Sequence, residues 1–76
     1  MRPEELFESI SSREDFMRFL EALIADYGNS TDEWENTSIE HFLEAMHAWA
    51  TDAQRLRDDP SWRDFAHLLL AGKRYE

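Results

Sequence analysis

Two acid-x-x-histidine pairs are the side chains whose types and spacing could do chemistry in this sequence. The pairs are Glu44 with His47 and Asp64 with His67. A separation of three residues brings both members of a pair to the same side of a helix. Two such pairs on facing helices, together with two further carboxylates, can hold a dinuclear iron or manganese centre. A small metal-dependent enzyme that uses these four residues is therefore one interpretation of the sequence.

The angular positions of these side chains argue against such a centre. Each residue advances a helix by about 100°, so Glu44 lies roughly 160° from the centre of the apolar stripe of its helix, and His67 roughly 130° from its own. His47 only flanks its stripe. We therefore expect surface histidines on solvated helices, with no metal site and no cofactor.

Other catalytic arrangements have little support in the sequence. Adjacent carboxylates occur at 4–5, 32–33 and 58–59, and acids at helix starts favour the positive end of the helix dipole. Acid–base catalysis instead needs two acids in unlike environments within a cleft. The chain has no cysteine and two glycines, and it contains neither a nucleophile elbow nor a glycine-rich phosphate loop. We predict no catalytic residues and no enzymatic activity.

The distribution of charge favours a particular class of partner. The chain has 17 acidic and 8 basic residues, for a net charge of −9, and the segment 19–54 contains eight acids without a lysine or arginine. Because binding of DNA, RNA or anionic membranes relies on positive charge, these partners are not expected. A basic protein is the complementary partner, although acidity can simply keep a chain soluble. The candidate contact residues in this segment are Glu33, Trp34, Glu35, Glu40 and Glu44.

The elements that must position these residues are helices. Apolar side chains recur at spacings of three and four, which predicts amphipathic helices at about 12–27, 38–56 and 60–72. A short helical turn is expected near 32–35, and a further short helix can begin at Pro3. The predicted stripes are Phe16, Phe19, Leu20, Leu23, Ile24 and Tyr27 in the first helix, Ile39, Phe42, Leu43, Met46, Trp49, Ala50 and Ala53 in the second, and Trp62, Phe65, Ala66, Leu69 and Leu70 in the third.

Helix-start and helix-stop signals bound these segments. Ser11 is the expected N-cap of the first helix, with Glu14 reaching back, and the box that begins at Thr37 opens the second. Asp59 before a proline is the expected cap of the third. Gly28 suits the end of the first helix, and Gly72 is expected to weaken the end of the third, where Lys73 and Arg74 complement the helix dipole.

These helices predict a single all-α domain over residues 1–76. The composition is 42% hydrophobic, with three tryptophans, two tyrosines and five phenylalanines, and no linker divides the chain. We expect a compact three-helix bundle in which each stripe is buried against the other two, so that losing Phe19 or Trp49 unfolds it. No apolar run is long enough for a membrane span. Acids at the N-terminus do not suit a signal peptide, which predicts a cytoplasmic protein.

Some apolar residues have two interpretations. Trp34 can plug one end of the bundle, with its indole donating to a backbone carbonyl, or it can be an exposed anchor for a partner. A second apolar patch at the stripe edges would provide the surface of a homodimer or of a partner complex. The residues of that patch are Met17, Leu43, Leu56 and Leu68.

Several motifs resemble a known family. They are Phe16-x-x-Phe19-Leu20-x-x-Leu23, Asp32-Glu33-Trp34-Glu35-Asn36-Thr37, Phe42-Leu43-Glu44-Ala45-x-x-x-Trp49, Asp59-Pro60-Ser61-Trp62-x-x-Phe65-Ala66-x-x-Leu69-Leu70 and the final Tyr75-Glu76. Over residues 12–76 the chain resembles a small all-helical bacterial domain of unknown function. Its relatives often have a longer segment with tyrosine and proline between the last two helices, where this chain has the short, charged stretch 51–59. The resemblance implies the helical fold and carries no activity.

The expected function is therefore that of a non-enzymatic helical interaction module. Its acidic middle segment would meet a basic protein, such as a toxin, a nuclease or a regulatory partner, by analogy with immunity and antitoxin proteins. One alternative is a homo-oligomeric structural domain that closes the leftover apolar patch. The other is the metal-dependent protein built on Glu44, His47, Asp64 and His67.

Overall fold

All regular secondary structure in the described part of the chain is helical. The computed structural model describes residues 2–52 and 56–75. The elements in chain order are α1 (Pro3–Leu6), the 3-10 turn η1 (Phe7–Ser9), α2 (Arg13–Asn29), the 3-10 turn η2 (Thr31–Glu33), α3 (Ile39–Asp52) and α4 (Trp62–Arg74). The predicted all-α class is confirmed, as are the short helix at Pro3 and the helical turn near 32–35. None of the helices in these residues has the length and apolar character needed to cross a membrane.

The N-cap of α2 is one residue later than expected. The Ser12 hydroxyl, rather than that of Ser11, accepts a hydrogen bond from the Asp15 N–H at 3.1 Å. The Asp15 carboxylate accepts from the backbone N–H of Ser11 at 3.1 Å in return. The Ser12 hydroxyl thus satisfies a donor that the helix leaves free, and the Asp15 carboxylate holds the residue before the N-cap. Similarly, Ser38, rather than the expected Thr37, caps α3 by accepting from the His41 N–H at 3.1 Å.

The start of α4 also differs from the prediction. The N-cap is Ser61 and not Asp59, and the helix begins after Pro60. The Ser61 hydroxyl accepts from the Asp64 N–H at 3.2 Å, and the Asp64 carboxylate accepts from the Ser61 N–H at 2.9 Å. This reciprocal pair satisfies two backbone groups, which an aspartate cap alone would not do. The predicted end of the second helix, at residue 56, lies beyond α3 and across residues 53–55, which are outside the described part.

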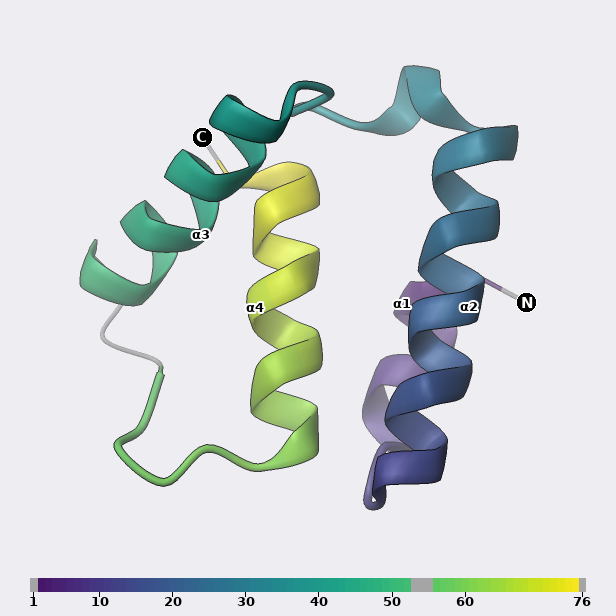
Figure 1. Ribbon diagram of the computed structural model, residues 1–76, viewed down its shortest axis with the longest axis vertical. Helices are drawn as coiled ribbons and strands as arrows, with labels where there is room; N and C mark the ends of the chain where they lie inside the picture. The colour runs from purple at the N-terminus through teal and green to yellow at the C-terminus, as the bar shows by residue number, and fades with distance from the viewer. Residues whose placement is uncertain (1, 53–55, 76) are drawn as a thin grey trace.

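The three long helices lie side by side in a thin layer. Figure 1 shows α4 between α3 and α2, with α1 behind α2, and the Cα extents are 31 × 29 × 16 Å. Helix α4 packs against both neighbours, whereas within the described residues α2 and α3 have no extended contact with each other. The expectation that each apolar stripe is buried against both others is therefore wrong for the α2–α3 pair, because α4 separates them.

The main core lies where η1, α2 and α4 meet. Its buried residues are Ile10, Phe19, Leu23 and Ala66, and half-buried Leu6, Phe7, Phe16, Trp34, Leu69 and Leu70 pack around them. On the other side of α4, α3 contributes the buried residues Ala45 and Trp49. The domain therefore uses both sides of α4 to bury apolar surface.

Gly72 allows α3 and α4 to approach closely. A Cβ atom at this position would lie 2.7 Å from Phe42 Cε1 and 2.9 Å from Met46 Cγ. The helix continues past Gly72 to Arg74, so the expectation that this glycine weakens the helix end is not met. A glycine inside a helix has a conformational cost, and here the close contact between helices accounts for it.

Alanine substitutions at the two glycines are expected to have opposite effects. Gly72→Ala should lower the free energy of unfolding by about 1–3 kcal/mol, because the added methyl group overpacks the contact with Phe42. Gly28→Ala should raise it by about 0.5–1 kcal/mol, because nothing lies within 4 Å of a Cβ atom there. Urea denaturation of both variants measures the two changes. Equal stabilisation by both would show that the α3–α4 contact is loose.

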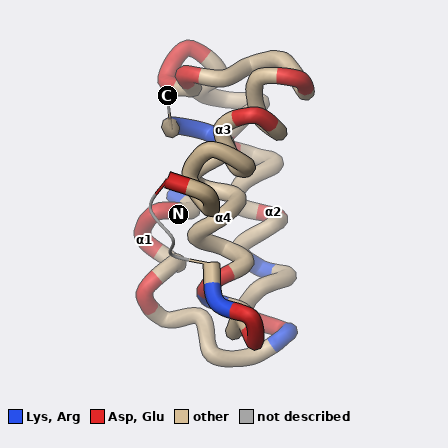
Figure 2. Tube along the Cα trace, turned by 90° about the vertical axis from the view of Figure 1, so that its left-hand side faces the viewer, with Lys and Arg blue, Asp and Glu red and all other residues tan. Residues whose placement is uncertain are grey.

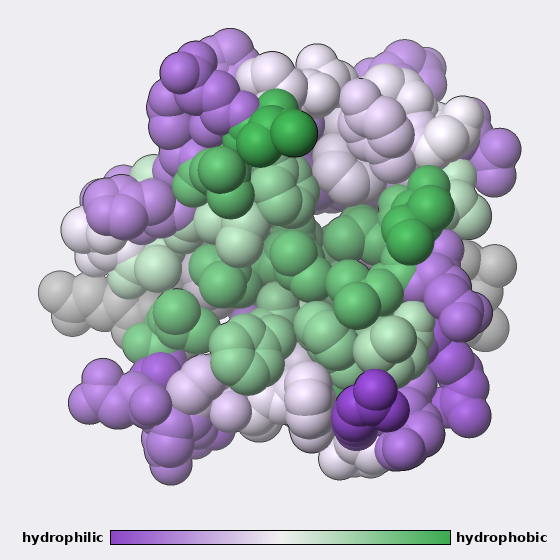
Figure 3. Space-filling view, viewed as in Figure 1, coloured by the Kyte–Doolittle hydropathy of each residue, from purple (hydrophilic) through white to green (hydrophobic). Residues whose placement is uncertain are grey.

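Several residues of the predicted stripes are exposed. The exposed fractions are 73% for Ile24, 79% for Ile39 and 56% for Leu43, and Tyr27, Trp62 and Phe65 are also exposed. In Figure 3, hydrophobic residues gather across the middle of the face that spans α3, α4 and α2. The expected burial of Ile24 and Ile39 is wrong because α2 and α3 have no extended contact with each other. The stripe of α4 itself is also exposed at Trp62 and Phe65.

Candidate functional site

A fully buried lysine lies at the C-terminal end of α4. The Lys73 ammonium is 2.7 Å from Asp26 Oδ2 of α2 and 2.7 Å from Glu4 Oε2 of α1. Lys73 is 0% exposed and Asp26 is 8% exposed. Lys73 lies in the last turn of α4, as expected, but its ammonium is enclosed rather than exposed. We call Glu4, Asp26, Lys73 and the neighbouring Trp34 the Lys73 cluster.

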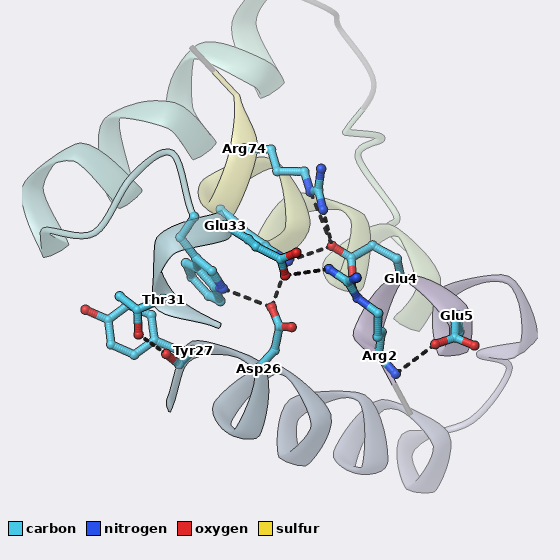
Figure 4. Close-up of polar contacts among 10 residues, drawn as sticks. Arg2, Glu4, Glu5, Asp26, Tyr27, Thr31, Glu33 and Arg74 are labelled. Carbon is cyan, nitrogen blue, oxygen red and sulfur yellow. Dashed lines mark hydrogen bonds and ion pairs between the residues drawn. The ribbon is translucent and has the colours of Figure 1, made fainter. Parts of the chain in front are cut away.

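Arginines surround this cluster at the surface. Arg74 donates to Glu4 Oε2 through Nη2 at 3.0 Å, and Arg2 donates from Nη2 to Glu33 Oε2 at 2.8 Å. Figure 4 shows the side chains of Asp26, Glu4, Arg2, Glu33 and Arg74 turned toward one another from α2, α1 and the residue before it, η2 and α4. One ammonium and the Asp26 carboxylate are thus buried together, with the half-buried Glu4 carboxylate and further cations toward the rim, and this pairing offsets their desolvation.

Trp34 covers the cluster as a plug. Its indole N–H donates to Asp26 Oδ2 at 2.9 Å, and the Lys73 ammonium lies 5.5 Å from the centroid of its ring. Tyr27 packs edge-on against it at 5.0 Å, and Phe42 stacks at 6.2 Å. The half-buried side chain follows the plug interpretation, except that the acceptor is a carboxylate rather than a backbone carbonyl.

The two residues after Trp34 cap the end of α4. The backbone N–H groups of Glu35 and Asn36 donate to the Lys73 carbonyl at 3.1 and 3.2 Å. The Asn36 side-chain amide donates to the carbonyls of Gly72 at 3.0 Å and Tyr75 at 2.9 Å. The last carbonyls of a helix have no partner within it. The Trp-Glu-Asn motif therefore has a structural role that sequence reasoning missed, because its partners lie 36 and 39 residues away.

The carboxyl groups of the cluster titrate at low pH. Burial would raise the pKa of Asp26, but hydrogen bonds from Lys73 and Trp34 and the charge of Lys73 outweigh it, so the pKa is lowered. Burial likewise opposes the lowering of the Glu4 pKa, which the hydrogen bond from Lys73 and further contacts produce. Both groups are therefore ionised at neutral pH, as the buried ammonium requires.

We expect the fold to lose stability in acid. Both folded pKa values are below the ordinary values of about 3.9 for Asp and about 4.3 for Glu, so the unfolded chain binds protons first as the pH falls. The contribution of the cluster is complete at neutral pH and is lost from about pH 4 downward, through the lowered folded pKa values. Urea denaturation at several pH values measures this slope, and Glu4→Gln should reduce it. A free energy of unfolding that stays constant down to about pH 3 would contradict the assignment.

The Lys73 cluster is a structural feature rather than a reaction centre. Its ammonium is sealed from solvent and held by two carboxylates, so it cannot reach a substrate. Its contacts join α1, α2, the chain after η2 and α4 at one point. Asp26, unlike the other acids of the segment 19–54, is buried where it pairs with Lys73.

The two acid-x-x-histidine pairs do not come together. Glu44 and His47 are exposed on α3, whereas Asp64 caps α4 and accepts from Arg57 Nε at 3.1 Å. Across residues 2–52 and 56–75, no three histidine, aspartate or glutamate side chains form a group that could hold a metal ion.

His67 is placed differently from the prediction. It is half-buried, and its ring centroid lies 5.0 Å from that of Phe7 and 4.7 Å from that of Trp49. The expected outward orientation is therefore wrong, because η1 and α3 supply aromatic surfaces on both sides of α4. A hollow of about 530 Å³ borders these rings together with Glu4, Leu70, Ala71, Arg74 and Tyr75.

A second hollow lies between α2 and α3. It has a volume of about 430 Å³ and is mostly apolar, and we call it the α2–α3 groove. Its lining residues are Leu23, Ile24 and Tyr27 from α2, Trp34, Asn36, Thr37 and Ser38 from the connecting chain, and Ile39 and Phe42 from α3. It occupies the opening that remains because the two helices do not pack together.

The segment that lines this groove is acidic on its surface. Of the eight acids in residues 19–54, seven are exposed and only Asp26 is buried. Glu35, Glu40 and Glu44 form no ion pair within the described residues, whereas Glu33 is paired with Arg2. Figure 2 shows acidic positions along α3 and at the end of the molecule from which α3 starts. Of the candidate contact residues, Trp34 is thus the one turned inward, as a wall of the groove.

Comparison with known proteins identifies a family but no activity. A family model described as a family of unknown function (DUF7660) matches residues 12–76. Neither the curated proteins nor the solved structures include a match to this chain. The matched region contains α2, α3 and α4. Residues 1–11 lie outside it, yet Pro3 and Ile10 are buried and Glu4 completes the Lys73 cluster.

Proposed function

We propose that this chain, which belongs to the DUF7660 family of unknown function, is a non-enzymatic module that binds a basic protein partner. The observation that carries the proposal is an acidic segment, 19–54, that also supplies every lining residue of an open apolar groove. Seven exposed acids lie in a segment without lysine or arginine, and the groove between α2 and α3 leaves apolar side chains accessible. These two features supply the two terms of a protein interface, which are charge complementarity and burial of apolar surface.

Glu35, Glu40 and Glu44 are the proposed electrostatic contacts. Their carboxylates are exposed and free of ion pairs within the described part of the chain, so an approaching cation displaces no internal partner. Glu33 is expected to contribute less to partner binding because its carboxylate is already paired with Arg2. Trp34 acts by shaping the groove wall. The analogy with immunity and antitoxin proteins, which are often acidic, suggests a toxin, nuclease or regulatory protein as the partner.

Affinity capture with a matched variant tests this proposal. The native chain should retain a basic protein from the source cells, and retention should fall steeply as salt rises because exposed charges are screened. A variant with Glu35→Gln, Glu40→Gln and Glu44→Gln keeps the size and polarity of these side chains and should lose that protein. Retention of the same proteins by both forms at every salt concentration would contradict the proposal.

A homo-oligomeric structural domain is the second candidate. The exposed apolar side chains Ile24, Ile39 and Leu43 favour it, since such surface commonly marks an interface. Analytical ultracentrifugation at increasing protein concentration distinguishes the two candidates. A concentration-dependent dimer supports self-association. A monomer that persists at high concentration supports binding of a different protein at the apolar face.

A further inference from the structure

We infer that the α2–α3 groove is the docking site of an amphipathic helix that carries lysine or arginine beside its apolar face. The inference rests on the proposed function and adds two statements to it, namely where the partner binds and what form the bound segment takes. The groove, its accessible walls and the charge around it are the observations that carry it.

The shape of the groove suits the apolar face of a helix. Ile24 on one wall is 73% exposed and Ile39 on the other is 79% exposed, and the buried Leu23 lies with Trp34 and Phe42 in the same lining. A helix presents apolar anchors at positions i, i+3 or i+4, and i+7, which fit between two such walls. The long helices flanking the hollow already lie as a layer only 16 Å thick in Cα extent, so a docked helix would form a second layer over it.

The charge decides between the possible occupants of the groove. A second copy of this chain would carry another net charge of −9. It would place its own acidic segment 19–54 against the same acidic segment of the first copy. Like charges placed across an interface are unfavourable. A segment with basic side chains beside its apolar face meets Glu35 and Glu40, which follow the groove-lining residues Trp34 and Ile39 directly in the chain.

The internal wall of the groove is held in place before any partner arrives. Trp34 is fixed by its hydrogen bond to Asp26 and by the Lys73 ammonium over its ring, and the following residues are tied to the end of α4. A preformed site loses less conformational freedom on binding. The Lys73 cluster therefore acts as the support of the groove.

Designed peptides of leucine and lysine provide the test. One peptide of about 14 residues, roughly 21 Å as a helix, places its leucines on one helical face. A second has the same composition in an order that has no apolar face, and a third replaces lysine by glutamate in the first pattern. Calorimetric titration of the native chain should show that the first peptide binds at least about tenfold more tightly than either control.

Substitutions in the groove should weaken this binding selectively. Ile24→Ser and Ile39→Ser are each expected to weaken the first peptide about tenfold or more, and both side chains are exposed, so the fold should persist. Met17→Ser is the matched control, because Met17 is a 43% exposed apolar residue of α2 outside the groove lining. It should leave the affinity unchanged, and circular dichroism should show that the peptide becomes helical when bound.

Three outcomes would overturn the inference. Equal affinity for the ordered and reordered lysine peptides would show charge attraction without recognition of a helix. Unchanged binding by Ile24→Ser and Ile39→Ser would place the peptide elsewhere. A native dimer that Ile39→Ser dissociates would show that a second copy occupies the groove. The first two outcomes would not affect the capture experiment on the variant of Glu35, Glu40 and Glu44. That experiment remains an independent test of the proposed function.

Discussion

Lys73→Met is expected to lower the free energy of unfolding at neutral pH by about 3–5 kcal/mol, the usual effect of removing one partner from a buried ion pair. The substitution keeps a long side chain but removes the ammonium, so the buried Asp26 carboxylate retains only the indole N–H of Trp34 as a side-chain donor. Domains of this size have a total stability of only about 5–10 kcal/mol. We therefore expect a largely destabilised protein, measured as a shift of the urea denaturation midpoint.

A neighbouring substitution provides the control for this effect. Arg74 is adjacent in sequence and also binds Glu4, but it is exposed. Arg74→Met should therefore cost at most about 1 kcal/mol, as exposed ion pairs usually do. Adding Asp26→Leu to Lys73→Met removes the orphaned charge and should recover part of the loss. A loss of less than about 1 kcal/mol in Lys73→Met would mean that water reaches Asp26 freely in the folded protein.

Phe19→Ala is expected to be similarly severe, with a loss of about 3–5 kcal/mol in the free energy of unfolding. Phe19 is 0% exposed and belongs to the core where η1, α2 and α4 meet. Because the domain leaves one face open, it has little other apolar burial to compensate for a cavity. Thermal and urea denaturation should both show the loss.

Ile24→Ala is the matched comparison on the same helix. Periodicity assigns Phe19 and Ile24 to one stripe, yet Ile24 is 73% exposed. Its truncation should change the free energy of unfolding by no more than about 0.5 kcal/mol, as surface substitutions commonly do. Comparable losses for the two variants would mean that the groove is closed in solution, either by a rearranged α3 or by a second copy.

Local sequence patterns predicted the helices but not always their first residues. Ser11 with Glu14 and Ser12 with Asp15 have the same capping spacing, so the sequence cannot choose between them. The structure uses the second pair. The same ambiguity placed the start of the last helix at Asp59 rather than after Ser61. Which of two adjacent residues caps a helix depends on the direction from which the chain enters the helix. The local sequence does not show that direction.

The buried charges depend on contacts that no local pattern reveals. Lys73 has the position of an ordinary helix-end cation, and its burial follows only when Asp26, 47 residues earlier, and Glu4, 69 residues earlier, converge on it. Periodicity also identifies which side of a helix is apolar without telling what covers it. Ile24 and Ile39 were therefore assigned to the core, although α4 reaches neither of the walls that they form.

The separation of α2 from α3 also bears on how members of this family can diverge. Residues such as Ile24 and Ile39 face outward and carry little of the folding energy, whereas Phe19, Asp26 and Lys73 are enclosed. Substitutions at the outward positions can therefore accumulate at little cost in stability while the enclosed positions stay unchanged. The composition of the open apolar face can thus change from one family member to another without passing through an unfolded form.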